Sequence, residues 1–406
     1  MNKTLSALLA LVFAASWVFS EAVRNPWYHE LPCKGFTRDN ITYIPLEGDM
    51  KHPNSAWGSI GTAREGFVYV MVCDHISDAE IFEYNAAKNK LFTLGKVSDH
   101  LALKSWAERT PKVHTQVVQN PKDGLIYFGT DAGDRSEDLF DHADEGYWGS
   151  YLCTLDPKTK EVRNLGMAGR HAGAKSLAVD PAGNTIYLNL SNGARFVRYD
   201  IKTRRFTDMG RINGRDIPRT LFLDKWGRVY NATESSHLVR FDPARGALEF
   251  LDARLPNSMG VSQVAYGPDM DYIYMICSYT VGDVYKYTPE KEGPGRLDSL
   301  GVIMNKPGAI RNLNISDGKL YAVMTGREAG EAGSDSVTKA DMVVFDPVKR
   351  AVEKRIRMDL CVGACYGGPN RDKAGNCYIA AFGGDAVGKK ENPSRVFLVK
   401  FNPKSL

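Results

Sequence analysis

The sequence predicts an all-β fold: a seven-bladed β-propeller of four-stranded antiparallel blades, with the ring closed by an N-terminal strand. Three observations lead to this prediction. A strand pair around a glycine turn recurs along the chain, a second pair around an Asp-Pro turn follows most copies, and the last copy stops one strand short. Self-similarity of this kind, with several strands in each unit, is typical of propellers.

The first strand pair is clearest in PKVHTQVVQNPKDGLIYFG, which runs from Pro111 to Gly129. Asp123-Gly124 is a strong signal for a tight turn between two strands. We expect strands a and b of a blade on either side of each such turn, with a tyrosine in strand b. The repeated tyrosines are Tyr69, Tyr127, Tyr187, Tyr230, Tyr274, Tyr321 and Tyr378.

The second strand pair follows a pattern of an apolar residue, any residue, an aromatic residue, Asp-Pro and then Lys or Arg. It reads CTLDPKTKEVRNLG at 153–166 and VRYDIKTRRFTDMG at 197–210, where isoleucine replaces the proline. We expect strands c and d on either side of this turn. The seventh unit ends with VFLVKFNPKSL, just after its strand c. The segment from Gly35 to Glu47 is predicted to supply the missing strand, because pairing the termini removes a free sheet edge.

Length and composition are those of an ordinary globular protein, with 406 residues, 43% of them hydrophobic and 25% charged. Residues 1–22 have a lysine, an apolar run and a Ser-Glu-Ala end, which predicts a cleaved secretory signal peptide. Residues 23–406 are then expected to form one propeller domain. We expect a secreted or periplasmic monomer without a membrane span.

Cysteines and net charge add weaker constraints. Seven cysteines leave at least one thiol free. Cys361 and Cys365 are candidates to pair with each other, or one of them with Cys377, and their spacing matches no zinc motif. The net charge of +4 comes with no lysine-rich tail and no aromatic-basic module, so we expect no nucleic-acid partner.

Positive charge is predicted to gather at one mouth of the central channel. Strand a of each blade lines the channel, and counting back from each turn glycine places mainly long polar residues where these strands begin. Several converging cations with almost no carboxylates would form an anion site. The ring comprises His114, Lys175, Arg219, Gln263, Arg311 and Tyr366, and the connection before Lys175 adds Arg170 and His171.

The longest insertion, Thr130 to Ser150, is expected between strands b and c of blade 2, above the same mouth. Long insertions on such a face are usually functional. It carries His142 and the pair Tyr147-Trp148, which suits stacking on a sugar ring.

This set of residues suits β-elimination at a uronate. That reaction needs a cation to neutralise the carboxylate, a base for the C5 proton and an acid for the leaving oxygen. Arg219 and Lys175 suit the first role. His114 suits base, acid or both, because histidine titrates near neutral pH. Tyr147, His142 or His171 are candidates to share the proton transfer.

The chain also resembles a known family: the exported seven-bladed propellers that process rhamnose–glucuronate linkages in plant arabinogalactans, with the related ulvan lyases. Four motifs carry the resemblance across nearly the whole mature chain. They are NPWYHELPCKGF near the mature start, HPNSAWGS at His52–Ser59, KVHTQ at Lys112–Gln116 and GRHAGAKS at Gly169–Ser176.

The resemblance implies elimination by histidines and an arginine of the channel face, which correspond to His114, His171 and Arg219. It also implies an alternative. A related α-L-rhamnosidase branch uses one histidine on the opposite face, which corresponds to His52. Some members hold a structural calcium ion in the channel, which makes such an ion a candidate here. We expect the chemistry of this chain to require no cofactor.

Four functions therefore stay open from the sequence. The first is a lyase of an acidic, uronate-containing polysaccharide or oligosaccharide. The second is an exo-α-L-rhamnosidase that uses His52, and the third is a propeller that binds glycans or proteins without turnover. The fourth, a redox-cofactor or lactonase-type propeller, fits less well because lactonase-like channels place acidic and amide ligands on a metal.

Overall fold

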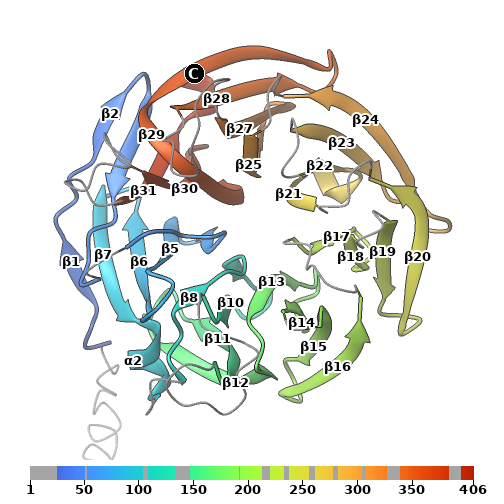
Figure 1. The fold of residues 1–406 in the computed structure, drawn as a ribbon, viewed down its shortest axis with the longest axis horizontal. Coiled ribbons are helices and arrows are strands. Elements are labelled where there is room, and N and C mark those ends of the chain that lie inside the picture. The colour runs from blue at the N-terminus through green and yellow to red at the C-terminus, as the bar shows by residue number, and fades with distance from the viewer. Residues whose placement is uncertain are drawn as a thin grey trace, which may run out of the picture.

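The chain folds into seven blades arranged around a central channel, as the sequence predicts (Figure 1). This computed structural model describes residues 25–50, 53–103, 108–133, 147–191, 193–212, 220–232, 237–255, 261–277, 282–303, 308–326, 339–383 and 395–406. The expected signal peptide, 1–22, lies outside these ranges. Within them, no helix combines the length and apolar character that crossing a membrane requires.

Strands a and b form the inner half of each blade. Strand a is β4 (Ile60–Thr62), β8 (Lys112–Val113) with β9 (Val118–Gln119), β13 (Ala174–Val179), β17 (Phe222–Leu223), β21 (Val261–Tyr266), β25 (Gly308–Asn312) with β26 (Asn314–Ser316), and the second half of β29 (Ala351–Arg371). Strand b is β5 (Phe67–Cys73), β10 (Ile126–Asp131), β14 (Thr185–Leu190), β18 (Val229–Ala232), β22 (Ile273–Cys277), β27 (Lys319–Gly326) and β30 (Cys377–Gly383).

Strands c and d form the outer half. Strand c is β6 (Ala79–Asn85), β11 (Gly149–Leu155), β15 (Arg195–Asp200), β19 (His237–Asp242), β23 (Asp283–Thr288), β28 (Lys339–Asp346) and β31 (Arg395–Phe401). Strand d is β7 (Lys90–Lys96), β12 (Val162–Arg170), β16 (Arg205–Arg211), β20 (Ala247–Arg254), β24 (Arg296–Val302), the first half of β29, and β3 (Ile41–Pro45). Short helices are α2 (Val97–Leu101), η2 (Pro268–Met270) and η3 (Pro403–Ser405).

The N-terminal segment closes the ring, which confirms the expected strand between Gly35 and Glu47. Strand β3 pairs antiparallel with β31, with Ile41 opposite Phe401 and Pro45 opposite Phe397. Two further strands extend the outer edge: β2 (Phe36–Arg38) pairs with β3, and β1 (His29–Leu31) pairs with β7 of blade 1. The start of the described chain therefore pairs with strands of both the first and the last blade (Figure 1).

Blades 6 and 7 are joined more closely than the sequence suggested. Strand β29 is continuous over 21 residues. Its first half pairs with β28 as strand d of blade 6, and its second half pairs with β30 as strand a of blade 7. Arg311 of β25 also pairs in parallel with Tyr366 of β29.

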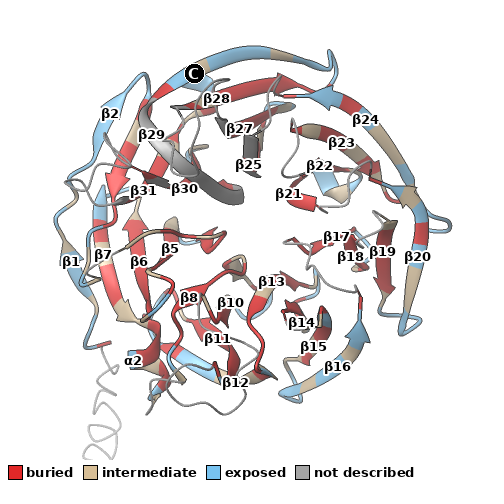
Figure 2. Cartoon of the chain, viewed as in Figure 1, coloured by how far each residue is buried: buried red, intermediate tan, exposed pale blue. Residues whose placement is uncertain are grey.

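The core lies between blades rather than inside a single sheet. Among the described residues, buried apolar side chains form clusters at each junction of neighbouring blades. The inner strands are buried, whereas the strands d of several blades alternate or face solvent (Figure 2). This arrangement explains why the apolar residues repeat with the blades.

The repeated tyrosines are all buried in strand b. Several hydroxyls donate a hydrogen bond to an aspartate of the preceding a–b turn, as Tyr127 does to Asp123 at 2.8 Å and Tyr378 does to Asp372 at 2.7 Å. Burial, together with the nearby carboxylate of Asp372, raises the pKa of Tyr378 well above its usual value. In these blades the hydrogen bond ties strand b to its turn, whereas Tyr69 of blade 1 donates to Glu83 of strand c.

Three of the described cysteines, Cys73, Cys153 and Cys377, are buried, and Cys33 is partly exposed. Cys33, Cys73, Cys153 and Cys377 are free. The pairing of Cys377 with Cys361 or Cys365 is therefore absent, because Cys377 is enclosed in the core between blades 6 and 7. The side chains of Cys361 and Cys365 lie outside the described part of the chain.

Blade 4 carries the most enclosed version of the tyrosine–aspartate bond. The carboxylate of Asp224 accepts from the Tyr230 hydroxyl at 2.7 Å and from Nε of Arg228 at 2.6 Å, and all three side chains are buried. The other guanidinium nitrogens of Arg228 donate to the carbonyl oxygens of Glu290 and Lys291 in blade 5. One buried ion pair therefore also links two blades.

We predict that Asp224→Ala lowers the free energy of unfolding by about 3 to 5 kcal/mol, because removing one partner leaves the buried charge of Arg228 uncompensated. Urea unfolding followed by tryptophan fluorescence measures the change. The matched control is Asp298→Ala, which breaks a more exposed pair with Arg296 and is expected to cost less than about 1 kcal/mol. Equal losses in the two variants would contradict the prediction.

Candidate functional site

The ring presents two chemically different faces. The a–b turns lie at one end of the channel together with the c–d turns, and we call this end the turn face. The d–a and b–c connections lie at the other end. His114 belongs to this second end, which we call the His114 face. It lies in a short interruption of strand a of blade 2, between β8 and β9.

His114 is almost fully buried at this mouth, with 5% of its surface exposed. Its Nδ1 lies 3.0 Å from the carbonyl oxygen of Lys175 in blade 3. Because a carbonyl can only accept, Nδ1 carries the hydrogen, and in the neutral ring Nε2 then carries the lone pair. The indole of Trp57 lies nearly parallel to the imidazole, with ring centroids 6.0 Å apart.

Two lysines and one buried carboxylate surround this pair of rings. Nζ of Lys112 lies 4.4 Å from the ring centroid of Trp57. Nζ of Lys175 contacts both carboxylate oxygens of Asp131, at 2.9 and 3.0 Å. The sequence predicted almost no carboxylates at this mouth. That prediction overlooked Asp131, which is fully buried at the end of β10 and compensates the charge of Lys175.

A second histidine, His75, lies at the same mouth and was not expected from the sequence. Its Nδ1 donates to Oδ1 of Asn54 at 2.6 Å, and its ring meets the edge of Trp57 at a centroid distance of 5.4 Å. It has a left-handed backbone with φ of 69°. The close approach of its carbonyl to Gly133 leaves no room there for a side chain. The available signal in the sequence was a histidine in the short connection after strand b of blade 1, which leads to the same face as His114.

Cys73 lies beside His75 but is not a nucleophile. Its sulfur is fully buried and lies 3.1 Å from the hydroxyl oxygen of Ser55. Burial raises the pKa of the thiol to about 12, although Lys112 lowers it in part. The thiol is therefore neutral at physiological pH, and the site has no thiolate at this position.

The insertion of blade 2 contributes one exposed and one enclosed aromatic ring. Tyr147 is fully buried, and its hydroxyl oxygen lies 3.1 Å from the hydroxyl oxygen of Thr130. Trp148 is 36% exposed and is the ring of this pair that can reach a ligand. His171 braces both residues, because its backbone N–H donates to the Trp148 carbonyl and its Nδ1 donates to the Tyr147 carbonyl.

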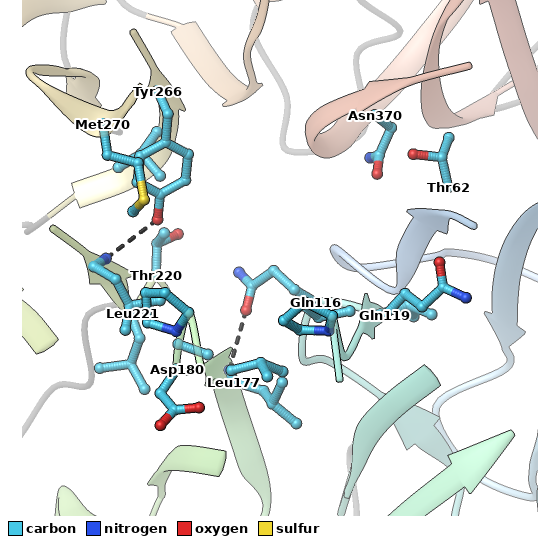
Figure 3. A pocket seen from close by; sticks show the side chains of 18 of the residues that line it. Thr62, Gln116, Gln119, Leu177, Asp180, Thr220, Leu221, Tyr266, Met270 and Asn370 are labelled. Carbon is cyan, nitrogen blue, oxygen red and sulfur yellow. Dashed lines mark hydrogen bonds between the residues drawn. The ribbon is translucent and has the colours of Figure 1, made fainter. Parts of the chain in front are cut away.

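The remaining expected residues are scattered or lie beyond the described part of the chain. Arg170 is exposed at the end of β12. Gln263 lines a cavity in the channel itself, which Figure 3 shows from close by. The structure brings the backbones of Arg311 and Tyr366 together but does not describe their side chains. His52, His142 and Arg219 lie outside the described residues.

Metal ligands do not gather in the described part of the chain. No group of three or more His, Cys, Asp or Glu side chains among those residues is placed to hold a metal ion. The calcium ion that the resemblance implies therefore stays an expectation.

No family model matches the chain, and no curated protein matches it either. The fold is thus established by the structure alone.

Asp78 fixes the connection that carries His75. Its Oδ1 accepts from the backbone N–H groups of Ala79 and Ser98 and from the hydroxyl of Thr110. It therefore joins blade 1 to α2 and to the segment that leads into blade 2. Burial raises the pKa of this carboxyl to about 6, although the hydrogen bonds from Ser98, Ala79 and Thr110 lower it in part.

We predict that ionisation of Asp78 lowers the free energy of unfolding as pH rises from about 4 to about 6. A carboxyl whose pKa is raised by folding binds its proton more tightly in the folded state, so its contribution is lost as it ionises. Asp78→Asn should remove this slope and leave a variant more stable than the wild type at pH 7, by on the order of 2 to 3 kcal/mol. Thermal unfolding from pH 4 to 8 measures it, and an unchanged slope would contradict it.

Proposed function

We propose that this chain is a secreted polysaccharide lyase that cleaves a rhamnose–glucuronate type of linkage in an acidic glycan by β-elimination. The observation that carries the proposal is the surroundings of His114. Its imidazole stacks on Trp57, the ammonium group of Lys112 lies over the same indole, and its Nδ1 donates to the Lys175 carbonyl. An aromatic ring offers an apolar surface, lysines suit a carboxylate, and an imidazole suits proton transfer.

Each step of the elimination has a candidate group at this mouth. The C5–H bond of the uronate breaks, its electron pair forms the C4–C5 double bond, and the bond from C4 to the glycosidic oxygen breaks. The base keeps the C5 proton, and an acid protonates the leaving oxygen. Lys112 and Lys175 are both candidates to balance the uronate carboxylate, and both lie close to the buried carboxylate of Asp131.

The histidines at the mouth are the candidates for proton transfer. Nε2 of His114 carries the lone pair when Nδ1 donates to the Lys175 carbonyl, so the neutral ring can act as a base. His75 is held by Asn54 in the same tautomer and is a second candidate for the acid or the base. Arg219 and His142 remain proposed members of the site on the basis of the sequence, and Tyr147 and His171 support the insertion above it.

An exo-α-L-rhamnosidase that uses His52 is the second candidate. The motif that contains that histidine, HPNSAWGS, lies partly beside the histidines of the mouth, because Asn54 contacts His75 and Trp57 contacts both His75 and His114. The resemblance puts the rhamnosidase histidine on the face opposite the lyase site. In this chain the described part of the motif belongs to the His114 face, so the two reactions are distinguished by their products rather than by their location.

Incubating the purified protein with a rhamnose-capped glucuronate glycan, and separately with ulvan, tests the proposal. We expect growing ultraviolet absorbance from an unsaturated uronate, because elimination leaves a double bond conjugated with the carboxylate. Release of free rhamnose without absorbance would instead support hydrolysis. Binding of either glycan without turnover would support a non-catalytic propeller and contradict both enzymes.

We predict that His114→Ala reduces kcat for elimination by about 10²- to 10⁴-fold, the usual contribution of a general acid or base. The thermal midpoint should be measured alongside, since the variant also loses the bond to the Lys175 carbonyl. The matched control is His29→Ala, which removes an exposed histidine of the outer strand β1 and should leave kcat unchanged. Full activity in His114→Ala would exclude His114 as the catalytic histidine.

A further inference from the structure

The channel contains a second chemically distinct site below the His114 mouth. It is a cavity of about 550 Å³ bounded by the inner strands of blades 1 to 5 and blade 7 (Figure 3). The cavity extends to the turn face, because Pro121, Pro181 and Met270 from the a–b turns line it. Small-molecule sites in proteins span about 300 to 1,000 Å³, so the space suits a ligand of one or two rings.

The wall of the cavity is mostly aliphatic. Leu177 and Val179 line it from β13, Leu221 and Leu223 from blade 4, and Val264 from β21. Among the described lining residues, the charged side chains are Arg64 and Asp180, which belong to the a–b turns at the rim. A charged ligand would lose its hydration inside this cavity without a described partner of opposite charge, so the wall favours an uncharged one.

Polar groups from several blades nevertheless face the same space. They include the amides of Gln116, Gln263 and Asn370 and the hydroxyl of Thr220 (Figure 3 labels three of these four). The side-chain amide oxygen of Gln116 accepts a hydrogen bond from the backbone N–H of Leu177 at 3.1 Å. The hydroxyl of Thr220 donates to the backbone carbonyl of Ser262 at 2.6 Å. These bonds hold both side chains in place across blade boundaries.

Gln263 differs from the other three side chains in its hydrogen bonding. It is 5% exposed, and its side-chain amide makes no hydrogen bond to any residue that the structure describes. The amide is not among the described side-chain groups that are both shut off from solvent and without a partner, so it faces the cavity, where water or a ligand can supply its hydrogen bonds. The amide therefore offers one acceptor and two donors to a molecule in the cavity.

We propose that the cavity binds an uncharged saccharide of one or two units, taken up from the turn face. Such a ligand combines C–H surfaces, which suit the aliphatic wall, with hydroxyl groups, which can both donate to and accept from the Gln263 amide. The site is separate from the acidic-glycan site at the His114 face, and it does not depend on the function proposed there.

Isothermal titration of the full mature chain tests this proposal with a panel of uncharged methyl hexosides and methyl 6-deoxyhexosides, and with methyl glucuronoside as the charged counterpart. We expect at least one uncharged glycoside to bind and the glucuronoside to bind at least tenfold more weakly. We expect Gln263→Leu, which keeps the size of the side chain, to weaken that binding by about tenfold.

Gln263→Glu adds a pH readout that a general packing defect would not produce. Burial raises the pKa of a carboxyl, so the introduced group should be neutral at low pH and ionised at higher pH. Binding of the uncharged glycoside should then weaken between about pH 5 and pH 8 in this variant and stay constant in the wild type. Thermal unfolding of both Gln263 variants shows that they are folded.

The matched control is Asn164→Leu, an amide-to-leucine change on the exposed strand β12, which should leave the affinity within about twofold. Three results would overturn the proposal. They are no binding of any uncharged glycoside at 10 mM or so, equal binding by the Gln263→Leu variant, and displacement of the glycoside by an acidic glycan, which would place both ligands at the His114 face.

Discussion

The pairing of β3 with β31 is the constraint on which the rest of the structure depends. It joins segments from the two ends of the chain, with Ile41 opposite Phe401, and it turns a row of blades into a ring. Each blade buries its apolar side chains only against a neighbour, so an open row would leave two such faces exposed. Closure thus supplies the last junctions and removes a free sheet edge at the same time.

The closed ring also determines what the channel can contain. Strand a of every blade approaches one axis, and side chains reach from one inner strand to the backbone of the next. His114 bonds to the Lys175 carbonyl, and the Ser262 hydroxyl donates to the Ile310 carbonyl at 2.9 Å. The same bond that places the His114 ring at the mouth therefore also joins blades 2 and 3, so the role proposed for His114 and the stability of the ring are coupled at this residue.

Much of the fold could be predicted because its signals are local and repeated. Turn glycines and buried tyrosines mark each blade, and the truncated seventh unit indicates the need for a closing strand. The partners at the site could not be predicted, because they come from different blades. Asp131 beside Lys175, and Trp57 beside His114, are far apart in sequence and meet only when neighbouring blades pack together. The continuous strand β29 was hidden because it contains Gly363, Gly367, Gly368 and Pro369, residues that usually mark turns.

Two histidines near the mouth have an unusual backbone conformation. His75 and His171 both have positive φ, at 69° and 51°, where glycine would fit with less strain. Each places Nδ1 against an oxygen of a neighbouring connection, Asn54 for His75 and Tyr147 for His171. A left-handed backbone costs roughly 1 to 2 kcal/mol for a residue with a side chain. A glycine would avoid this cost but would supply no imidazole, so the two histidines are best explained by what their rings hold in place above the channel.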